Sequence, residues 1–214
     1  MNARALLQVI TADLDMVLDR DPSITSRSEA LLHPTVIAIW GYRVSHWLHL
    51  RGHRRSARFV MVIARLLTGG IEIHPGAQIG RGFFIDHGAG VVIGETVVIG
   101  DDVTIFHQVT LGAVGWWHDN QRPEGSRRHP KLGDRVVVGA NATLLGPITV
   151  GHDSVVGAQA LVIRDVPADS RVLAPFSVPA LRSTRGVVKA ARARHPVQIT
   201  GLRHKGAQAV FPTW

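Results

Sequence analysis

Residues 71–112 read IEIHPGAQIGRGFFIDHGAGVVIGETVVIGDDVTIFHQVTLG. An aliphatic residue returns at every sixth position of this stretch: Ile73, Ile79, Ile85, Val91, Val97, Val103 and Val109. The same spacing resumes further along the chain at Leu132, Val138, Leu144, Val150, Val156 and Val162. This period is neither the period of about 3.6 residues of a helix nor the period of about 2 residues of an alternating strand.

A fixed repeat of six residues is typical of a parallel β-helix. Each hexad would supply one short strand and a turn, and successive hexads would close a triangular coil with the aliphatic residue inside. The sequence therefore predicts a mainly β chain. Its centre is a parallel β-helix of hexapeptide repeats spanning residues 71–167.

The repeat is interrupted between Val109 and Leu132. These residues are 23 positions apart, which is not a multiple of six. The chain must therefore leave the coils in an excursion loop at about 112–130, which contains Trp116 and Trp117. Long loops inside compact domains are uncommon and are usually functional or disordered.

The first 70 residues are predicted to form an α-helical N-terminal cap. Apolar residues at helical spacing indicate three segments, at 5–18, 34–50 and about 55–68. Asp21-Pro22 ends the first segment, and Gly69-Gly70 ends the third. We expect this cap to cover one open end of the β-helix, as repeat proteins require.

Composition narrows the class of protein. No cysteine is present, which excludes disulfides, thiolate metal sites and a cysteine nucleophile. No signal peptide is recognisable, and the longest apolar run, residues 59–67, is interrupted by Arg65 and too short to span a bilayer. We expect a soluble, cytoplasmic protein that does not bind a membrane.

The net charge of +8 is concentrated near the C-terminus. Asp169 is the last acidic residue, whereas arginines and lysines continue to Lys205. This excess predicts a basic, partly disordered tail at 168–214. No nucleic-acid motif or aromatic interleaving accompanies it, so we expect no nucleic-acid partner.

Three of the twelve histidines lie beside other chemically useful residues: His74, His87 and His129. A coil of about 18 residues would stack Glu72 on Gly90 and bring its carboxylate near His87. An acid-held imidazole is the arrangement that a general base needs. Alternatively, Asp86 and His87 only cap a tight turn, and the spacing favours neither interpretation.

Arg128 precedes His129 in the excursion loop. Its guanidinium could grip a carboxylate in a two-pronged hydrogen bond. Without further context, a solvated pair of loop charges, Arg127 and Arg128, is the favoured interpretation.

Six motifs closely resemble the serine O-acetyltransferases, which are hexapeptide-repeat acyltransferases with a left-handed β-helix. They are residues 71–77 (IEIHPGA), 79–82 (IGRG), 86–88 (DHG), 91–96 (VVIGET), 109–112 (VTLG) and 128–130 (RHP). The resemblance extends into the cap and covers roughly residues 5–170. It implies acetylation of L-serine to O-acetylserine, a step of cysteine biosynthesis, with acetyl-CoA as donor and no metal.

For catalysis, the resemblance implies that His87 is the general base and that Glu72 orients it. His129 would lie near the serine hydroxyl and the developing oxyanion. Transfer in the family is direct, within a ternary complex. The lack of cysteine agrees, because no acyl-thiol intermediate can form.

For binding, the resemblance implies that Asp21 and Asp86 hold the ammonium of serine and that Arg128 holds its carboxylate. The turn at Gly112 would contact the substrate. The CoA arm would lie in a groove between subunits against four small residues: Gly139, Ala140, Gly157 and Ala158.

Three departures from the family pattern concern the acceptor. Glu72 replaces a common aspartate, Ala113 replaces a usual glycine, and the loop with Trp116 and Trp117 is longer than usual. These changes keep open an O-acetyltransferase for homoserine, a sugar or another hydroxylated metabolite. A zinc-dependent β-helical carbonic anhydrase lacks an evident three-histidine spacing, and a non-enzymatic scaffold is the remaining alternative.

The resemblance also implies a homotrimer, with active sites between subunits, or a dimer of trimers. The family docks into cysteine synthase through a C-terminal isoleucine. Trp214 is the last residue of this sequence, so we do not expect that complex.

Overall fold

The computed structural model describes residues 3–174. Four helices come first: α1 (Ala3–Arg20), α2 (Arg27–Ala30), α3 (Pro34–Leu50) and α4 (Arg54–Leu67). Short strands follow: β1 (Glu72–Ile73), β2 (Gln78–Ile79), β3 (Phe84–Ile85), β4 (Val92–Ile93), β5 (Val98–Ile99), β6 (Thr104–Ile105) and β7 (Thr110–Gly112). After helix α5 (Trp116–Asp119) come β8 (Lys131–Leu132), β9 (Val137–Val138), β10 (Thr143–Leu145), β11 (Thr149–Val150), β12 (Val155–Val156), β13 (Leu161–Val162) and β14 (Arg171–Val172).

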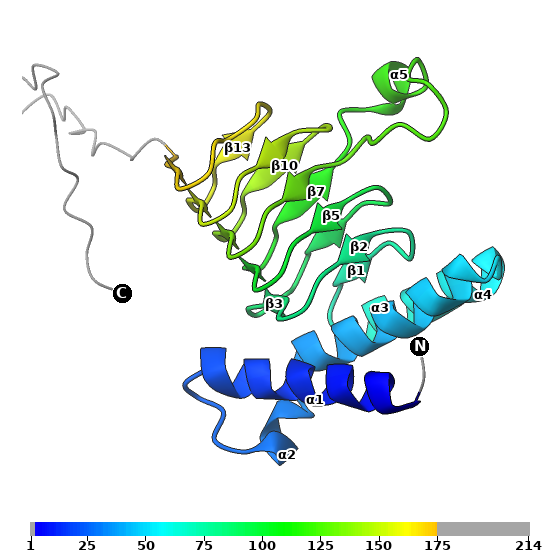
Figure 1. The fold of residues 1–214 in the computed structure, drawn as a ribbon, viewed down its shortest axis with the longest axis vertical. Coiled ribbons are helices and arrows are strands. Elements are labelled where there is room, and N and C mark those ends of the chain that lie inside the picture. Colours follow the sequence, from blue (N-terminus) through cyan, green and yellow to red (C-terminus); the bar gives the residue numbers. More distant parts are fainter. Residues whose placement is uncertain (1–2, 175–214) are drawn as a thin grey trace, which may run out of the picture. The chain divides into compact units, whose positions relative to one another are not determined.

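The strands form three parallel sheets that the chain visits in turn (Figure 1). The first sheet has the order β1-β4-β7-β10-β13, the second β2-β5-β8-β11 and the third β3-β6-β9-β12-β14. We call the turns from the first to the second sheet the first corner, those from the second to the third the second corner, and those from the third back to the first the third corner. The chain is therefore a parallel β-helix with a helical N-terminal segment, as predicted.

The register of the first coil differs from the prediction. Glu72 pairs with Val92, 20 positions later, and does not stack on Gly90. The next step, from Val92 to Thr110, has the expected 18 positions. Two additional residues lie in the turn between β3 and β4, so Ile93, and not Val91, is equivalent to Ile73. Val91 and Ile93 are both buried, which is why the six-residue spacing continued unbroken through the insertion.

The helical segment covers the end of the β-helix formed by the first coil, where α1, α3 and α4 contact β1 and β3 (Figure 1). The Tyr42 hydroxyl donates to the carbonyl of Ala77 at 2.7 Å, and Thr35 donates to the carbonyl of Ile85. A Cβ on Gly41 would lie 2.6 Å from the Cβ of Ala64, so glycine permits the close crossing of α3 and α4. The described helices and coils share one core and form one compact unit.

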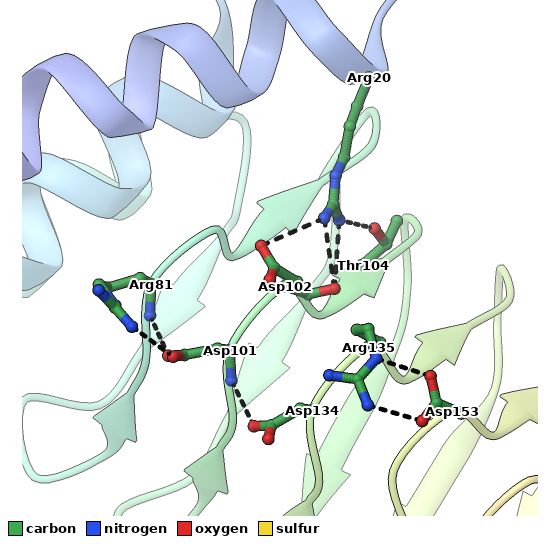
Figure 2. A network of polar contacts seen from close by, with 8 residues as sticks. All are labelled: Arg20, Arg81, Asp101, Asp102, Thr104, Asp134, Arg135 and Asp153. Carbon is green, nitrogen blue, oxygen red and sulfur yellow. Dashed lines mark hydrogen bonds and ion pairs between the residues drawn. The ribbon is translucent and has the colours of Figure 1, made fainter.

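The second corner carries a network of charged side chains (Figure 2). Asp101 accepts hydrogen bonds from the backbone and side chain of Arg81, and Asp134 accepts one from the backbone of Asp101. Arg20 of α1 reaches the same corner and pairs with Asp102 at 3.7 Å. The network joins successive coils to one another and to α1.

Helix α3 has the bounds expected from the sequence, whereas α1 and α4 extend to slightly different residues, and α2 and α5 were not predicted. Strand β14 pairs with β12, so the β-helix continues past residue 167. The predicted tail from residue 175 onward lies outside the described residues. Among the described helices, none combines the length and apolar character needed to cross a bilayer.

Candidate functional site

The third corner presents His87 in the enlarged turn of the first coil. Its backbone has φ 60°, and its side chain is 75% exposed. The nearest carboxylate is that of Asp86, with 3.7 Å between Oδ1 and Nε2. His107 occupies the equivalent position one coil later, and the two rings meet edge to face with centroids 5.9 Å apart.

The helical segment adds Asp21 to this corner. Its carboxylate accepts two hydrogen bonds from Ser23, at 2.9 and 2.7 Å. These bonds, helped by the nearby imidazoles of His33 and His87, lower the pKa of Asp21. His33 lies 3.5 Å from the Asp21 carboxylate, and burial lowers the pKa of its ring. Asp21 is therefore a carboxylate anion close enough to His87 to interact with it electrostatically.

We call these five residues the third-corner group: Asp21, His33, Asp86, His87 and His107. Sequence reasoning missed two of them. His33 is the N-cap residue immediately before α3 and has no motif around it. His107 could have been found only from the 20-residue register of the first coil, which the sequence repeat concealed.

Small residues continue the column below His87 and His107. The strand register places Ala140 and Ala158 at the equivalent positions of the next two coils. A Cβ on Gly139 would lie 2.6 Å from the backbone nitrogen of Ala158. Together with Gly157, these residues form a narrow strip of small residues on the same corner as the two imidazoles.

The first corner carries a pocket of about 330 Å³. Its polar lining includes Arg58, Glu72, His74, Glu95, Arg128 and His129, with Gly112 beside them. We call this the first-corner pocket. Arg128 and His129 come from the end of the excursion loop, whereas the acidic residues belong to the first two coils.

Ion pairs occupy both carboxylates of the first-corner pocket. Arg128 donates to Glu95 at 2.7 Å, and Arg65 of α4 pairs with Glu72 at 2.8 Å. Within one chain, Glu72 lines the first-corner pocket, whose lining does not include His87. The 18-residue coil predicted that the two residues would lie close together, but the two-residue insertion shifts the register, so Glu72 in β1 pairs with Val92.

His129 is held by Thr96. Its Nδ1 lies 3.2 Å from the backbone nitrogen and 2.8 Å from the hydroxyl oxygen of Thr96. The residue is 7% exposed, and burial, together with the neighbouring guanidinium of Arg128, lowers the pKa of its imidazole. The ring lies over Gly94, where a Cβ would come within 2.1 Å of Nε2.

His74 is a second buried imidazole in the pocket, with 9% of its surface exposed. Its Nδ1 accepts a hydrogen bond from the backbone of Gly76 at 2.9 Å. Its Nε2 is buried and has no partner among the described residues. Burial first, and then the charge of Arg58, lower the pKa of His74 to about 4, so the ring is neutral at neutral pH.

The excursion loop projects from the stack after β7 and contains α5 (Figure 1). Asp119, the last residue of α5, is buried, and its carboxylate lies 3.0 Å from Arg122. Arg127 closes the base of the loop by donating to the carbonyls of Pro147 and Ile148, both at 2.7 Å. The tip presents Trp116 and Trp117, which are 73% and 61% exposed. The loop is therefore fixed where it returns to the coils and exposes two apolar side chains.

The predicted site residues thus fall into two sets. Asp21, Asp86 and His87 meet at the third corner, whereas Glu72, Arg128, His129 and Gly112 meet at the first corner. The first-corner pocket contains all four members of the second set and none of the first. One set offers an exposed imidazole beside anions, and the other offers cationic and neutral hydrogen-bond donors around a small cavity.

Neither set resembles a metal site. In the part of the chain that the structure describes, three side chains that could share an ion occur together at the second corner: His152, Asp153 and Asp169. All three are exposed, and Asp153 is already paired with Arg135 at 2.7 Å. This position lies away from both sets.

Comparison with known proteins gives consistent results. The family model "Bacterial transferase hexapeptide (six repeats)" matches residues 129–164. The serine acetyltransferase of Mycobacterium tuberculosis is 47% identical over 169 residues, covering 78% of this chain and 70% of the relative. The enzyme of Helicobacter pylori strain 26695 is 51% identical over 162 residues, covering 75% and 90%.

A solved structure of Neisseria gonorrhoeae serine acetyltransferase in complex with serine superposes with a TM-score of 0.72. It is 36% identical, and the match covers 82% of this chain and 69% of that one. The repeats and this similarity show that the coils form a left-handed parallel β-helix, which confirms the fold predicted from the sequence.

Proposed function

The chain belongs to the serine acetyltransferase family, acyltransferases that O-acetylate serine in cysteine biosynthesis, and on this premise we propose that acetyl-CoA is its donor and His87 its general base. The observation that carries the proposal is the column at the third corner. An exposed imidazole there is followed by the strip of small residues, next to anions that suit the ammonium of serine.

In the proposed reaction, His87 accepts the proton of the serine hydroxyl as the oxygen attacks the thioester carbonyl of acetyl-CoA. The tetrahedral intermediate collapses, the C–S bond breaks, and CoA leaves as a thiolate that takes the proton from His87. No bond forms between the acetyl group and the protein. His87 suits this role because its ring is exposed, and the nearest carboxylate among the described residues, that of Asp86, is 3.7 Å from Nε2.

We propose that the two sets of residues together bind the ammonium and carboxylate groups of serine. Asp21 and Asp86 would bind the ammonium, and Arg128 would bind the carboxylate. Arg128 can do so while paired with Glu95, because a guanidinium has five N–H donors. The Gly112 turn would contact the substrate, and Glu72 would orient the His87 ring of a neighbouring subunit.

This assignment requires association of subunits, since the two sets lie on different corners. We propose a homotrimer, or a dimer of trimers, in which the first corner of one subunit faces the third corner of the next. Helix α4 supports this assembly with an exposed apolar stripe beside the first-corner pocket: Phe59, Val62, Ile63, Leu66 and Leu67. The CoA arm would lie in the groove at the subunit interface, against Gly139, Ala140, Gly157 and Ala158.

Replacement of His87 tests the mechanism. We expect His87→Ala to lower kcat by about 10²–10⁴-fold, measured by release of the CoA thiol, with binding of acetyl-CoA retained in calorimetry. His152→Ala, which removes an exposed imidazole at the second corner, is the matched control. An active His87→Ala enzyme would remove this mechanism.

A different hydroxyl acceptor is the second candidate, and the excursion loop favours it. Ala113 of this loop lines the first-corner pocket, and the exposed Trp116 and Trp117 follow closely. Thiol release with serine, homoserine and sugars as acceptors separates the two candidates. Serine should give the highest kcat/KM if the first proposal holds.

A further inference from the structure

We infer that Thr96 is a positioning residue that holds His129 as a neutral imidazole with its proton on Nε2, so that His129 donates a hydrogen bond to the developing oxyanion and does not act as a second base. The inference rests on the proposed function for the oxyanion. The tautomer of His129 is inferred from the hydrogen bonds alone and does not depend on the proposed function.

The hydroxyl of Thr96 has one orientation that satisfies its neighbours. Its oxygen accepts hydrogen bonds from the backbone N–H of Arg128 at 2.8 Å and of His129 at 3.2 Å. With both acceptor positions used, the hydroxyl hydrogen is left to donate to the remaining neighbour, Nδ1 of His129, at 2.8 Å.

A second donor reaches the same ring nitrogen. The backbone N–H of Thr96 lies 3.2 Å from Nδ1. Two donors converging on Nδ1 leave no place for a proton on it, because an N–H there would face two other hydrogens. A neutral imidazole carries one proton, and in His129 that proton must be on Nε2.

The neutral form is also the one that its surroundings favour. The ring is buried and adjoins the guanidinium of Arg128, which both disfavour a charged imidazole. Asp119 and Glu95 act in the opposite direction, but each is paired with an arginine, Arg122 and Arg128 respectively. The pocket therefore keeps His129 as a donor without a net charge.

This arrangement separates the tasks of the two histidines. Nε2–H of His129 belongs to the first-corner pocket, beside Gly94, and can stabilise negative charge on the carbonyl oxygen of the thioester without losing its proton. Among residues 3–174, none donates a hydrogen bond to the ring of His87, which is the proposed acceptor of the serine proton. Glu95 thus holds the side chain of Arg128, and the adjacent Thr96 holds the side chain of His129.

The tautomer can be measured directly on the full-length protein labelled with ¹⁵N-histidine. Long-range ¹H–¹⁵N correlation spectra give the protonation of each ring nitrogen, and loss of a signal in His129→Asn assigns His129. We expect an unprotonated Nδ1 and a protonated Nε2 throughout pH 6.5–8.5. A proton on Nδ1 in the wild-type protein would overturn the inference, whatever the variants do.

Two substitutions separate the hydroxyl from the shape of the side chain. Thr96→Val keeps the branched shape and removes the hydroxyl, whereas Thr96→Ser keeps the hydroxyl. We expect the spectrum of Thr96→Val to move toward a mixture of tautomers, and that of Thr96→Ser to match the wild type. An unchanged tautomer in folded Thr96→Val would also contradict the role of Thr96.

Kinetics complete the test. We expect Thr96→Val to lower kcat by about 10–100-fold, less than the loss of an entire oxyanion donor, with KM for acetyl-CoA changed by less than about 2-fold. Thr96→Ser should recover kcat to within about 3-fold. If serine is not acetylated by the wild-type enzyme although His129 has the expected tautomer, the proposed function fails and the tautomer assignment stands. If serine is acetylated and Nδ1 is protonated, only the inference fails.

Discussion

The charged side chains of the second corner join successive coils and line an open pocket of about 460 Å³ that contains no imidazole, whereas those of the first corner line a pocket that also contains His74 and His129. At the second corner, Arg135 and Asp153 on successive coils form two parallel hydrogen bonds, both at 2.7 Å and both exposed (Figure 2). At the first corner, Arg128 pairs with Glu95 beside two buried imidazoles. Charged residues in hexapeptide turns therefore do not indicate a site by themselves. The proposed site is distinguished by a cavity that also contains two buried imidazoles.

Among the substitutions that compare the two corners, the largest effect should come from adding one methyl group at Gly94 of the first corner. A Cβ there would lie 2.0 Å from the ring of His129, so Gly94→Ala must displace the proposed oxyanion donor. Loss of one such donor typically lowers kcat by about 10²–10³-fold. Steady-state kinetics with serine and acetyl-CoA measure the change.

Gly100→Ala is the matched control at the second corner. Gly100 follows Ile99 as Gly94 follows Ile93, and its Cβ would lie 2.3 Å from the carboxylate of Asp134. This variant should lose stability and keep kcat within about 3-fold of the wild type. Equal losses of kcat in the two variants would mean that the corners do not differ in function.

Arg128→Leu should have the next largest effect. It removes the guanidinium that we assign to the serine carboxylate, and hydrogen bonds to charged groups contribute about 1.5–3 kcal/mol. We therefore expect KM for serine to rise by about 10–100-fold, with KM for acetyl-CoA nearly unchanged. Arg128→Lys retains the charge without the two-pronged geometry, so its KM for serine should lie between those of the wild type and Arg128→Leu. An unchanged KM for serine would mean that the acceptor has no carboxylate at this position.

The period of six residues was enough to predict the β-helix, and the proline at the start of α3 was enough to place that helix. The position of Glu72 relative to His87 could not be predicted. Val91 and Ile93 are both apolar and buried, so the sequence does not show which of them continues the strand after the insertion.

Thr96 was missed for a related reason. A threonine in a turn is common and does not by itself suggest a function. Thr96 gains its proposed role only because residues 128–129 return to the same corner after the excursion loop and form hydrogen bonds with it. Sequence reasoning therefore identified most of the charged and titratable residues of the candidate site, but it missed His33 and His107. It could not identify those that orient them, nor show that the predicted residues divide between two corners.

His74 should make the stability of the protein depend on pH. Its folded pKa, about 4, lies below the value of about 6.5 in an unfolded chain. The unfolded state therefore takes up a proton first as the pH falls, and the free energy of unfolding declines between about pH 6.5 and 4. In His74→Asn, whose amide oxygen can still accept from Gly76, this decline should be smaller by about 1–2 kcal/mol. Urea denaturation at pH 7 and pH 5 measures it.

His53→Asn, at an exposed position before α4, is the control and should leave the pH dependence unchanged. If wild type and His74→Asn lose stability in parallel between pH 7 and pH 5, His74 is not the group responsible. His129 should also make the free energy of unfolding decline as the pH falls, but by less than His74, because burial lowers its pKa as well.

The smallest effect should come from Arg135→Gln at the second corner. The ion pair with Asp153 is exposed, so water and salt screen it, and its loss should lower stability only slightly and less still at high salt. We expect kcat and both KM values to stay within about 2-fold of the wild type. Glu95→Gln removes a similarly short pair at the first corner, but it also releases Arg128 from its position in the pocket, so KM for serine should change. The two substitutions each break one arginine–carboxylate pair of nearly equal length, and a loss of activity in both would show that the network of Figure 2 supports catalysis as well as the fold.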